Sequence, residues 1–179
     1  NQFEEQKIID ADSIRYSQYQ KLRHPDLDVQ LKPYIKDKSK HFLVRRVSID
    51  IAEECEVKSL QNLLVDVALD NSDMHHIREQ ATHAVSRIAD NRTRLRLKPL
   101  AMKEQQEDVD DQLKGSALRA LWPDHLSAQE VFDILTPPKQ ENFFGSYVSF
   151  LMDFSEQLKK EDLPYALKWA KKNHGGKPG

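Results

Sequence analysis

Apolar residues recur along the middle of the chain at the spacing of one face of an α-helix. Three segments show them at positions i, i+4, i+7 and i+8; these are residues 43–55, 76–88 and 112–124. A small residue lies in the middle of each face, at Ser48, Ala81 and Ala117. The periodicity predicts three amphipathic helices, and the small residues predict close approach by a neighbouring helix. Thr82 is expected to lie off this core face.

Each predicted helix follows another apolar-periodic stretch, so the unit is a helix, a short turn and a second helix. The preceding stretches contain Leu27, Leu31, Tyr34 and Ile35; Leu60, Leu63, Leu64 and Val67; and Leu95, Leu97, Leu100 and Ala101. The matched positions Ser48, Ala81 and Ala117 are 33 and 36 residues apart, which is a typical length for a helical-hairpin repeat. We therefore expect three stacked hairpins over residues 24–124.

The first two units have the same spacing between an acidic and a basic residue. Asp37 precedes Arg45 by eight residues, and Asp70 precedes Arg78 by the same distance. This pattern resembles HEAT-type α-helical repeats, which feature an Asp in the turn and an Arg early in the second helix. The third unit departs from it and carries Lys114. The constant spacing favours structural roles for Arg45, Arg78 and Lys114 at the hairpin ends; the alternative is that they contact a ligand.

The chain after the predicted repeats is rich in aromatic residues. Ser127–Glu130 reads as a capping box that opens a helix, and a further helix is predicted near residue 162. Between them an aromatic stripe is expected to be buried; it comprises Phe143, Tyr147, Phe150 and Phe154. Residues 113–151 also resemble a helical-repeat region of large bacterial NACHT-type (STAND) NTPases. That region lies outside the nucleotide-binding module, so the resemblance implies no catalytic residue here.

Glycine content and charge narrow the fold and its chemistry. Residues 1–174 contain only Gly115 and Gly145, too few for a fold rich in hairpins, and no glycine-rich phosphate loop occurs. The sequence predicts an all-α fold, an α-solenoid of HEAT-like hairpins with an aromatic-rich C-terminal cap. The expected segments are an N-terminal helical segment at 1–23, hairpins at 24–124, C-terminal helices at 125–173 and a flexible tail at 174–179.

Several polar clusters are candidate sites. Positions opposite the predicted core of the second helices form a candidate partner surface; they are Arg46, Asp50, Glu53, Glu79, His83 and Arg119. The same inner row includes Ser86, Gly115 and Trp122. The segment 87–103 reads as one amphipathic helix with a basic face, and its candidate phosphate-contacting residues are Arg92, Arg94, Arg96, Lys98 and Lys103. Acidic residues follow at once, which favours a plain solvated surface.

The sequence disfavours two further kinds of site, a zinc site and a reactive thiol. His76, Glu79 and His83 have spacings that zinc sites use, but no H-E-x-x-H motif or Cys pair accompanies them. Cys55 is expected to be a buried, inert thiol rather than a nucleophile. We therefore expect no catalytic residue, no metal site and no cofactor in this chain.

The sequence favours a non-enzymatic scaffold or sensor module that binds a protein partner or the remainder of a longer bacterial chain. The alternative is a nucleic-acid-binding or processing protein similar to HEAT-like DNA glycosylases, which a formal net charge of −2 disfavours. The single cysteine fits a reducing, cytoplasmic setting. No apolar run reaches the length of a membrane span, so no membrane association is expected.

Overall fold

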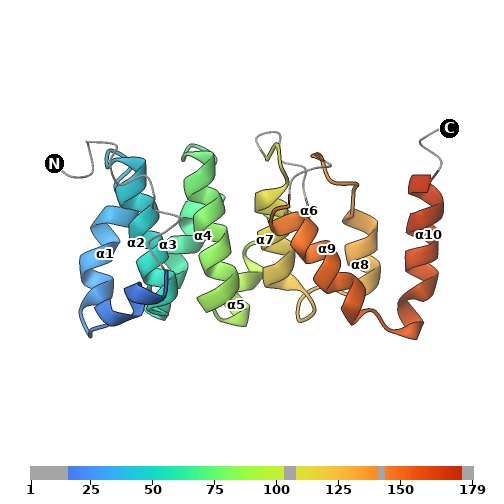
Figure 1. Ribbon diagram of the computed structural model, residues 1–179, viewed down its shortest axis with the longest axis horizontal. Helices are drawn as coiled ribbons and strands as arrows, with labels where there is room; N and C mark the ends of the chain where they lie inside the picture. Colours follow the sequence, from blue (N-terminus) through green and yellow to red (C-terminus); the bar gives the residue numbers. More distant parts are fainter. Residues whose placement is uncertain (1–15, 103–107, 141–143, 175–179) are drawn as a thin grey trace. The chain divides into compact units, whose positions relative to one another are not determined.

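The computed structural model describes residues 16–102, 108–140 and 144–174, and the regular elements in these ranges are all helical (Figure 1). The predicted all-α class is therefore confirmed for the described residues. None of their helices is long and apolar enough to cross a membrane. Lys103, Phe143 and most of the predicted N-terminal segment and tail lie outside these ranges.

The chain divides into two compact units, residues 1–93 and residues 94–179. The first unit contains η1 (Tyr16–Leu22), α1 (Leu27–Lys36), α2 (Phe42–Glu54), η2 (Lys58–Leu60), α3 (Gln61–Leu69) and α4 (His75–Ile88). The second contains α6 (Lys98–Met102), α7 (Gln112–Leu121), α8 (Ala128–Ile134), α9 (Ser146–Gln157), η3 (Lys160–Asp162) and α10 (Leu163–His174), and α5 (Asn91–Leu95) spans the boundary. The boundary lies inside the segment expected to hold three hairpins.

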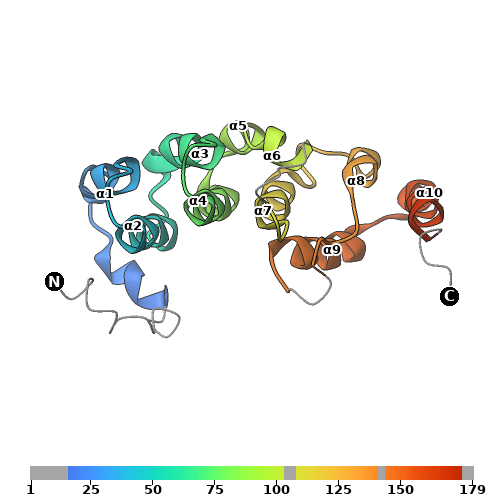
Figure 2. The ribbon, with the colours of Figure 1, turned by 90° about the horizontal axis from the view of Figure 1, so that it is seen from above.

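Two layers of helices build the first unit. Helix α1 packs on α2, α3 packs on α4, and the two pairs meet through α1–α3 and α2–α4 contacts (Figure 2). The aliphatic side chains between them are fully buried, as at Ile35, Ile49, Leu64 and Ile77. The two layers thus share one apolar core, and the burial of this core is the main source of stability for such a stack.

The two helix pairs place chemically similar residues 33 positions apart. Leu31 and Leu64, and Ile35 and Ala68, are buried at matching places on α1 and α3. The turns match as well. Asp37 Oδ1 accepts hydrogen bonds from the backbone N (2.9 Å) and Oγ (2.7 Å) of Ser39.

Asp70 repeats this turn geometry with Ser72, whose N and Oγ lie 3.0 and 2.7 Å from Asp70 Oδ1. In each case the side-chain carboxylate closes an Asx turn directly after a helix. Lys38 joins the two turns, because its Nζ donates to Ser72 Oγ (2.7 Å) and forms an ion pair with Asp70. These donors hold the pKa of Asp70 well below its ordinary value.

The α4 face is buried more broadly than its periodicity predicts. Ala81 is fully buried, in agreement with its expected place between helices. Thr82, expected off the core face, is also fully buried, so that expectation is wrong. Its Oγ1 donates to Arg78 O at 2.7 Å, which satisfies the hydroxyl within the helix and allows its burial between packed neighbours.

The segment 87–103 is not one amphipathic helix. After α4 ends, Asp90 Oδ1 accepts a hydrogen bond from Thr93 N (2.8 Å) and so caps the short helix α5. A second short helix, α6, then begins at Lys98 with Pro99 in its first turn, where proline is well tolerated. Leu97 and Leu100 are buried, but Leu95 is 44% exposed.

In the second unit, α7 packs against both α6 and α9. Gly115 is buried where α7 meets α9, and a Cβ there would lie 2.5 Å from Ser146 C and Tyr147 Cα. Gly115 therefore belongs to a helix contact rather than to an exposed row. The described members of the aromatic stripe, Tyr147, Phe150 and Phe154, are buried as predicted.

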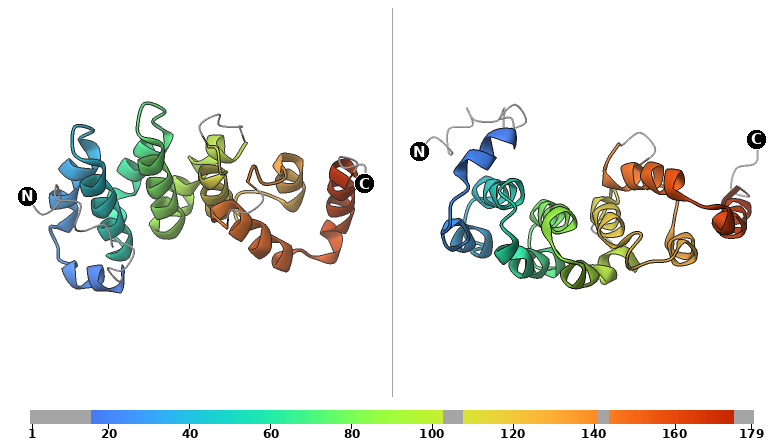
Figure 3. Two further views of the ribbon diagram at one scale, coloured as in Figure 1. Left: turned by 45° about the horizontal axis from the view of Figure 1, so that its top comes forward. Right: turned by 90° about the horizontal axis from the view of Figure 1, so that it is seen from below.

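The C-terminal helices begin where the sequence indicates. Ser127 caps α8, with its Oγ accepting from Glu130 N and the Glu130 carboxylate accepting from Ser127 N, so the predicted capping box is confirmed. Helix α10 begins at Leu163 and lies beside α8 (Figure 3).

Candidate interaction surface

Arg45 occupies a fully buried position at the end of the first helix pair. Its Nε and Nη2 donate to Ile35 O at 3.2 and 3.0 Å. Its Nη1 and Nη2 also form a bidentate pair with Asp73, with both distances 2.6 Å. Asp37, the turn residue eight positions before it, instead bonds Ser39. Arg45 thus links α1 to the turn that precedes α4, and its hydrogen bonds are structural.

The Asp73 carboxylate depends on this partner. Burial disfavours its ionisation, but hydrogen bonds from Arg45 and Met74 N outweigh burial and hold the pKa of Asp73 below its ordinary value. A charged pair this deeply buried is tolerated because the guanidinium and carboxylate match in geometry and the remaining donors reach a carbonyl.

Arg78 and Lys114, the other two cations expected at the hairpin ends, differ in burial and in their partners. Arg78 is also fully buried, and its Nε donates to Ala68 O at 3.2 Å, ten residues earlier, as Arg45 does with Ile35. Lys114 is only half-buried. Its Nζ donates to Thr136 Oγ1 (2.8 Å) and lies 5.0 Å from the centre of the Tyr147 ring.

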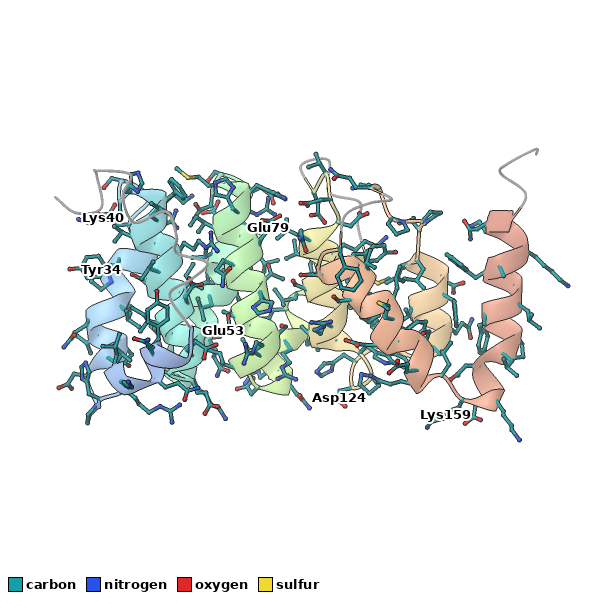
Figure 4. All side chains as sticks on the ribbon, viewed as in Figure 1. Tyr34, Lys40, Glu53, Glu79, Asp124 and Lys159 are labelled. Atoms are coloured by element: carbon teal, nitrogen blue, oxygen red, sulfur yellow. The ribbon has the colours of Figure 1, made fainter. Side chains whose placement is uncertain are left out.

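A polar cluster lies where α2 faces α4, and it brings together several residues of the predicted partner surface. Glu53 is buried at its centre (Figure 4). One carboxylate oxygen lies 3.1 Å from His83 Nδ1, and the other lies 2.9 Å from Arg87 Nη1. Arg87 also approaches Glu54 at 3.5 Å. We call Arg46, Asp50, Glu53, His83 and Arg87 the α2–α4 cluster.

Asp50 is the most perturbed member of this cluster. It is only 5% exposed, and its Oδ1 has no hydrogen-bond partner among the described residues. Burial raises its pKa to about 6, while Arg46 and His83 oppose the shift and Glu53 and Glu54 add to it. Because an ionised carboxylate is costly to bury without donors, Asp50 changes charge close to neutral pH.

The expected inner row is not an open, uniformly accessible surface. Asp50 and Glu53 are buried on α2, which packs against α4, and Ser86 is buried on α4. Two accessible groups of the cluster are His83 and Arg87, with side chains 37% and 56% exposed. The cluster is thus a recessed set of carboxylates beneath an exposed cation and an imidazole.

The other predicted partner-surface residues lie elsewhere. Glu79 lies nearer the N-terminal end of α4 (Figure 4), with Oε1 3.0 Å from His75 Nε2. Arg119 belongs to the second unit, where its Nη2 donates to Asp153 at 2.8 Å. Trp122 is covered by α9, since its Nε1 donates to Gln157 and its ring meets Phe154 edge-on.

The candidate phosphate-contacting residues do not share one helix. Arg92 and Arg94 lie on α5, Arg96 lies between α5 and α6, and Lys98 is the first residue of α6. Lys98 Nζ lies 3.7 Å from Glu130, which partly neutralises it. The break between α5 and α6 therefore divides the basic run that the sequence presents as continuous.

The three residues considered for a zinc site each contact a different partner. His83 bonds Glu53, Glu79 meets His75, and the His76 ring packs edge-on against Phe42 with ring centres 5.8 Å apart. Cys55 is buried, its Sγ lies 3.0 Å from Tyr19 O, and burial raises its pKa. A thiol in this state is a poor nucleophile, in line with its expected inert role.

Two surface pockets are further candidate sites. One, in the first unit, is largely polar; it is lined by Arg23, His24, Pro25, Leu27, Asp28, Cys55, Glu56, Val57, Lys58 and Ser59. The other lies between α8 and α10; it is lined by Phe132, Asp133, Tyr165, Lys168, Trp169 and Lys172. Sequence reasoning missed the second pocket, although the run of lysines interleaved with aromatic residues on α10 is visible in the sequence.

The chain matches no protein-family model, no curated protein and no solved structure. The arrangement of its residues is therefore the basis for any functional conclusion.

Proposed function

We propose that this chain is a non-enzymatic helical-repeat scaffold or sensor module, similar to HEAT-type proteins, that binds a protein partner. The observation that carries the proposal is the recurrence, 33 residues apart, of one hydrogen-bonded arrangement. The Asp37 and Asp70 turns are closed by the same bonds, and Arg45 and Arg78 donate to matching carbonyls. Such units stack on their neighbours and bind partners through successive helices.

The α2–α4 cluster supports the binding part of the proposal. It comes from two matching helices, and it offers the partly exposed Arg87 and His83 above the buried Glu53. Arginine is enriched among the residues that dominate binding energy in protein interfaces. The cluster is therefore the surface of the first unit that we assign to partner recognition.

Quantitative co-purification from the native host tests this proposal. Wild-type chain, Arg87→Ala and the matched control Lys32→Ala, which alters an exposed lysine on α1, are compared after circular dichroism has established that all three fold. We expect an identified protein to be retained by wild type and by Lys32→Ala and to be depleted about tenfold by Arg87→Ala. Equal retention by all three chains would contradict the assigned surface. The absence of any stoichiometric protein partner would contradict the function.

A further inference from the structure

Helix α10 contacts α8 through the face that carries Tyr165 and Trp169. Trp169 Nε1 donates to Leu135 O at 3.0 Å, and Asn173 Nδ2 donates back to Trp169 O at 2.9 Å. Tyr165 and Trp169 are half-buried toward α8. On the other side of the helix, Leu163 and Leu167 are 54% and 59% exposed.

The pocket between α8 and α10 has fixed aromatic walls. Trp169 is held by its bond to the Leu135 carbonyl, and the Phe132 ring packs against Phe154 with centres 5.1 Å apart. The pocket volume is about 120 Å³. Sites for drug-sized ligands occupy about 300–1,000 Å³, whereas a cavity of about 150 Å³ accepts benzene. The pocket therefore suits a single apolar side chain.

The charges around this pocket favour an acidic partner. Helix α10 contains Lys168, Lys171 and Lys172 and no carboxylate, and Asp133 is the one acid that lines the pocket. At about 100° per residue, the three lysines lie between the aromatic face of α10 and the edge formed by Leu163 and Leu167. A segment leaving the pocket across α10 thus meets ammonium groups first and apolar surface next.

We propose that the α8–α10 pocket docks an acidic segment of a partner protein, which inserts one apolar side chain between Phe132 and Trp169 and pairs its carboxylates with the lysines of α10. The proposal rests on the proposed function, because it names the class of partner that the module recognises. It adds a second contact surface, on the second unit, to the α2–α4 cluster.

The aromatic residues favour a protein partner over a membrane surface. Helices that lie in a lipid interface direct Trp, Phe and Leu toward the acyl chains. In α10, Tyr165 and Trp169 face α8, and the Trp169 indole already donates to a backbone carbonyl. Only Leu163 and Leu167 remain as large exposed apolar groups on α10.

Selection of random ten-residue peptides displayed on phage, with the full chain as bait, tests this proposal. We expect enriched peptides to contain several Asp or Glu around one shared apolar position. Synthetic copies should bind wild type and bind the double variant Lys168→Glu/Lys172→Glu about tenfold or more weakly. The matched control Lys159→Glu, an exposed lysine outside the pocket (Figure 4), should bind them as wild type does.

Two results overturn the docking proposal and leave the proposed function standing. One is enrichment of peptides without acidic residues; the other is acidic peptides whose affinity is the same for wild type and the double variant. A third result also overturns it: failure to enrich peptides, together with sedimentation of the chain on phosphatidylserine-containing vesicles and not on phosphatidylcholine vesicles, would assign α10 to an anionic membrane. Failure of the proposed function is recognised separately, in the co-purification with Arg87→Ala.

Discussion

Asp50 makes the stability of the chain depend on pH, and replacing it with asparagine should remove that dependence. Burial raises the pKa of Asp50 to about 6, from an ordinary 3.8. The carboxyl group of Asp50 therefore binds its proton more tightly in the folded state than in the unfolded state. The resulting contribution to the free energy of unfolding is fully present below about pH 3.8 and is lost as the pH rises through about 6.

The size of the effect follows from the shift. A difference of about two pKa units corresponds to about 3 kcal/mol, and about 2 kcal/mol of it is lost between pH 4.5 and pH 8. Asp50→Asn has a similar shape and does not titrate. From pH 4.5 to pH 8, the unfolding free energy of the variant should rise by about 2 kcal/mol relative to that of wild type. Burying the amide has a cost that does not change with pH, so it does not affect this difference.

Urea unfolding followed by circular dichroism, at pH 4.5 and at pH 8, measures this change. Asp26→Asn is the matched control, because Asp26 is an exposed residue before α1 and makes no side-chain capping bond there. Its difference from wild type should be nearly the same at both pH values. If Asp50→Asn behaves like this control, the reasoning about a buried, destabilising carboxylate is refuted.

Three further substitutions test the packing. Arg45→Met should lower the free energy of unfolding by about 3–5 kcal/mol, measured by urea titration, because it strands the buried Asp73 carboxylate; a loss below 1 kcal/mol would argue against a tight pair. Ala81→Leu should cost about 1–3 kcal/mol by overpacking, and Gln80→Leu, at a half-buried neighbour, should cost less. Gly115→Ala should lower the thermal midpoint markedly, since its Cβ would meet the α9 backbone; an unchanged midpoint would mean that α7 and α9 do not pack this closely.

Local signals in the sequence were sufficient to predict many helices. The Ser127–Glu130 capping box is visible from residue types alone, and it begins α8 as expected. The starts of α5 and α6 also had visible signals that the apolar spacing obscured. Asp90 precedes Thr93 at capping distance, and Pro99 suits the first turn of a new helix.

Burial of polar residues was harder to predict, because it depends on which helices meet. Glu53 and Thr82 occupy positions that periodicity places away from the core, yet both are buried, Glu53 on α2 and Thr82 on α4. The partner of Glu53, His83, lies on another helix, and the partner of Thr82, the Arg78 carbonyl, lies one turn away. Similarly, the bond from Arg45 to Asp73 crosses between helix pairs, so spacing within a single pair indicated Asp37 instead.

Removal of one 33-residue unit tests the central claim, that the chain is built from equivalent helical repeats, most directly. Deletion of residues 38–70 joins the Asp37 turn to Asn71 and brings α4 into the place of α2. Arg78 should then donate to Ile35 O instead of Ala68 O. Urea unfolding by circular dichroism should show a helical chain with a single cooperative transition. An unfolded or non-cooperative product would contradict the equivalence of the two helix pairs.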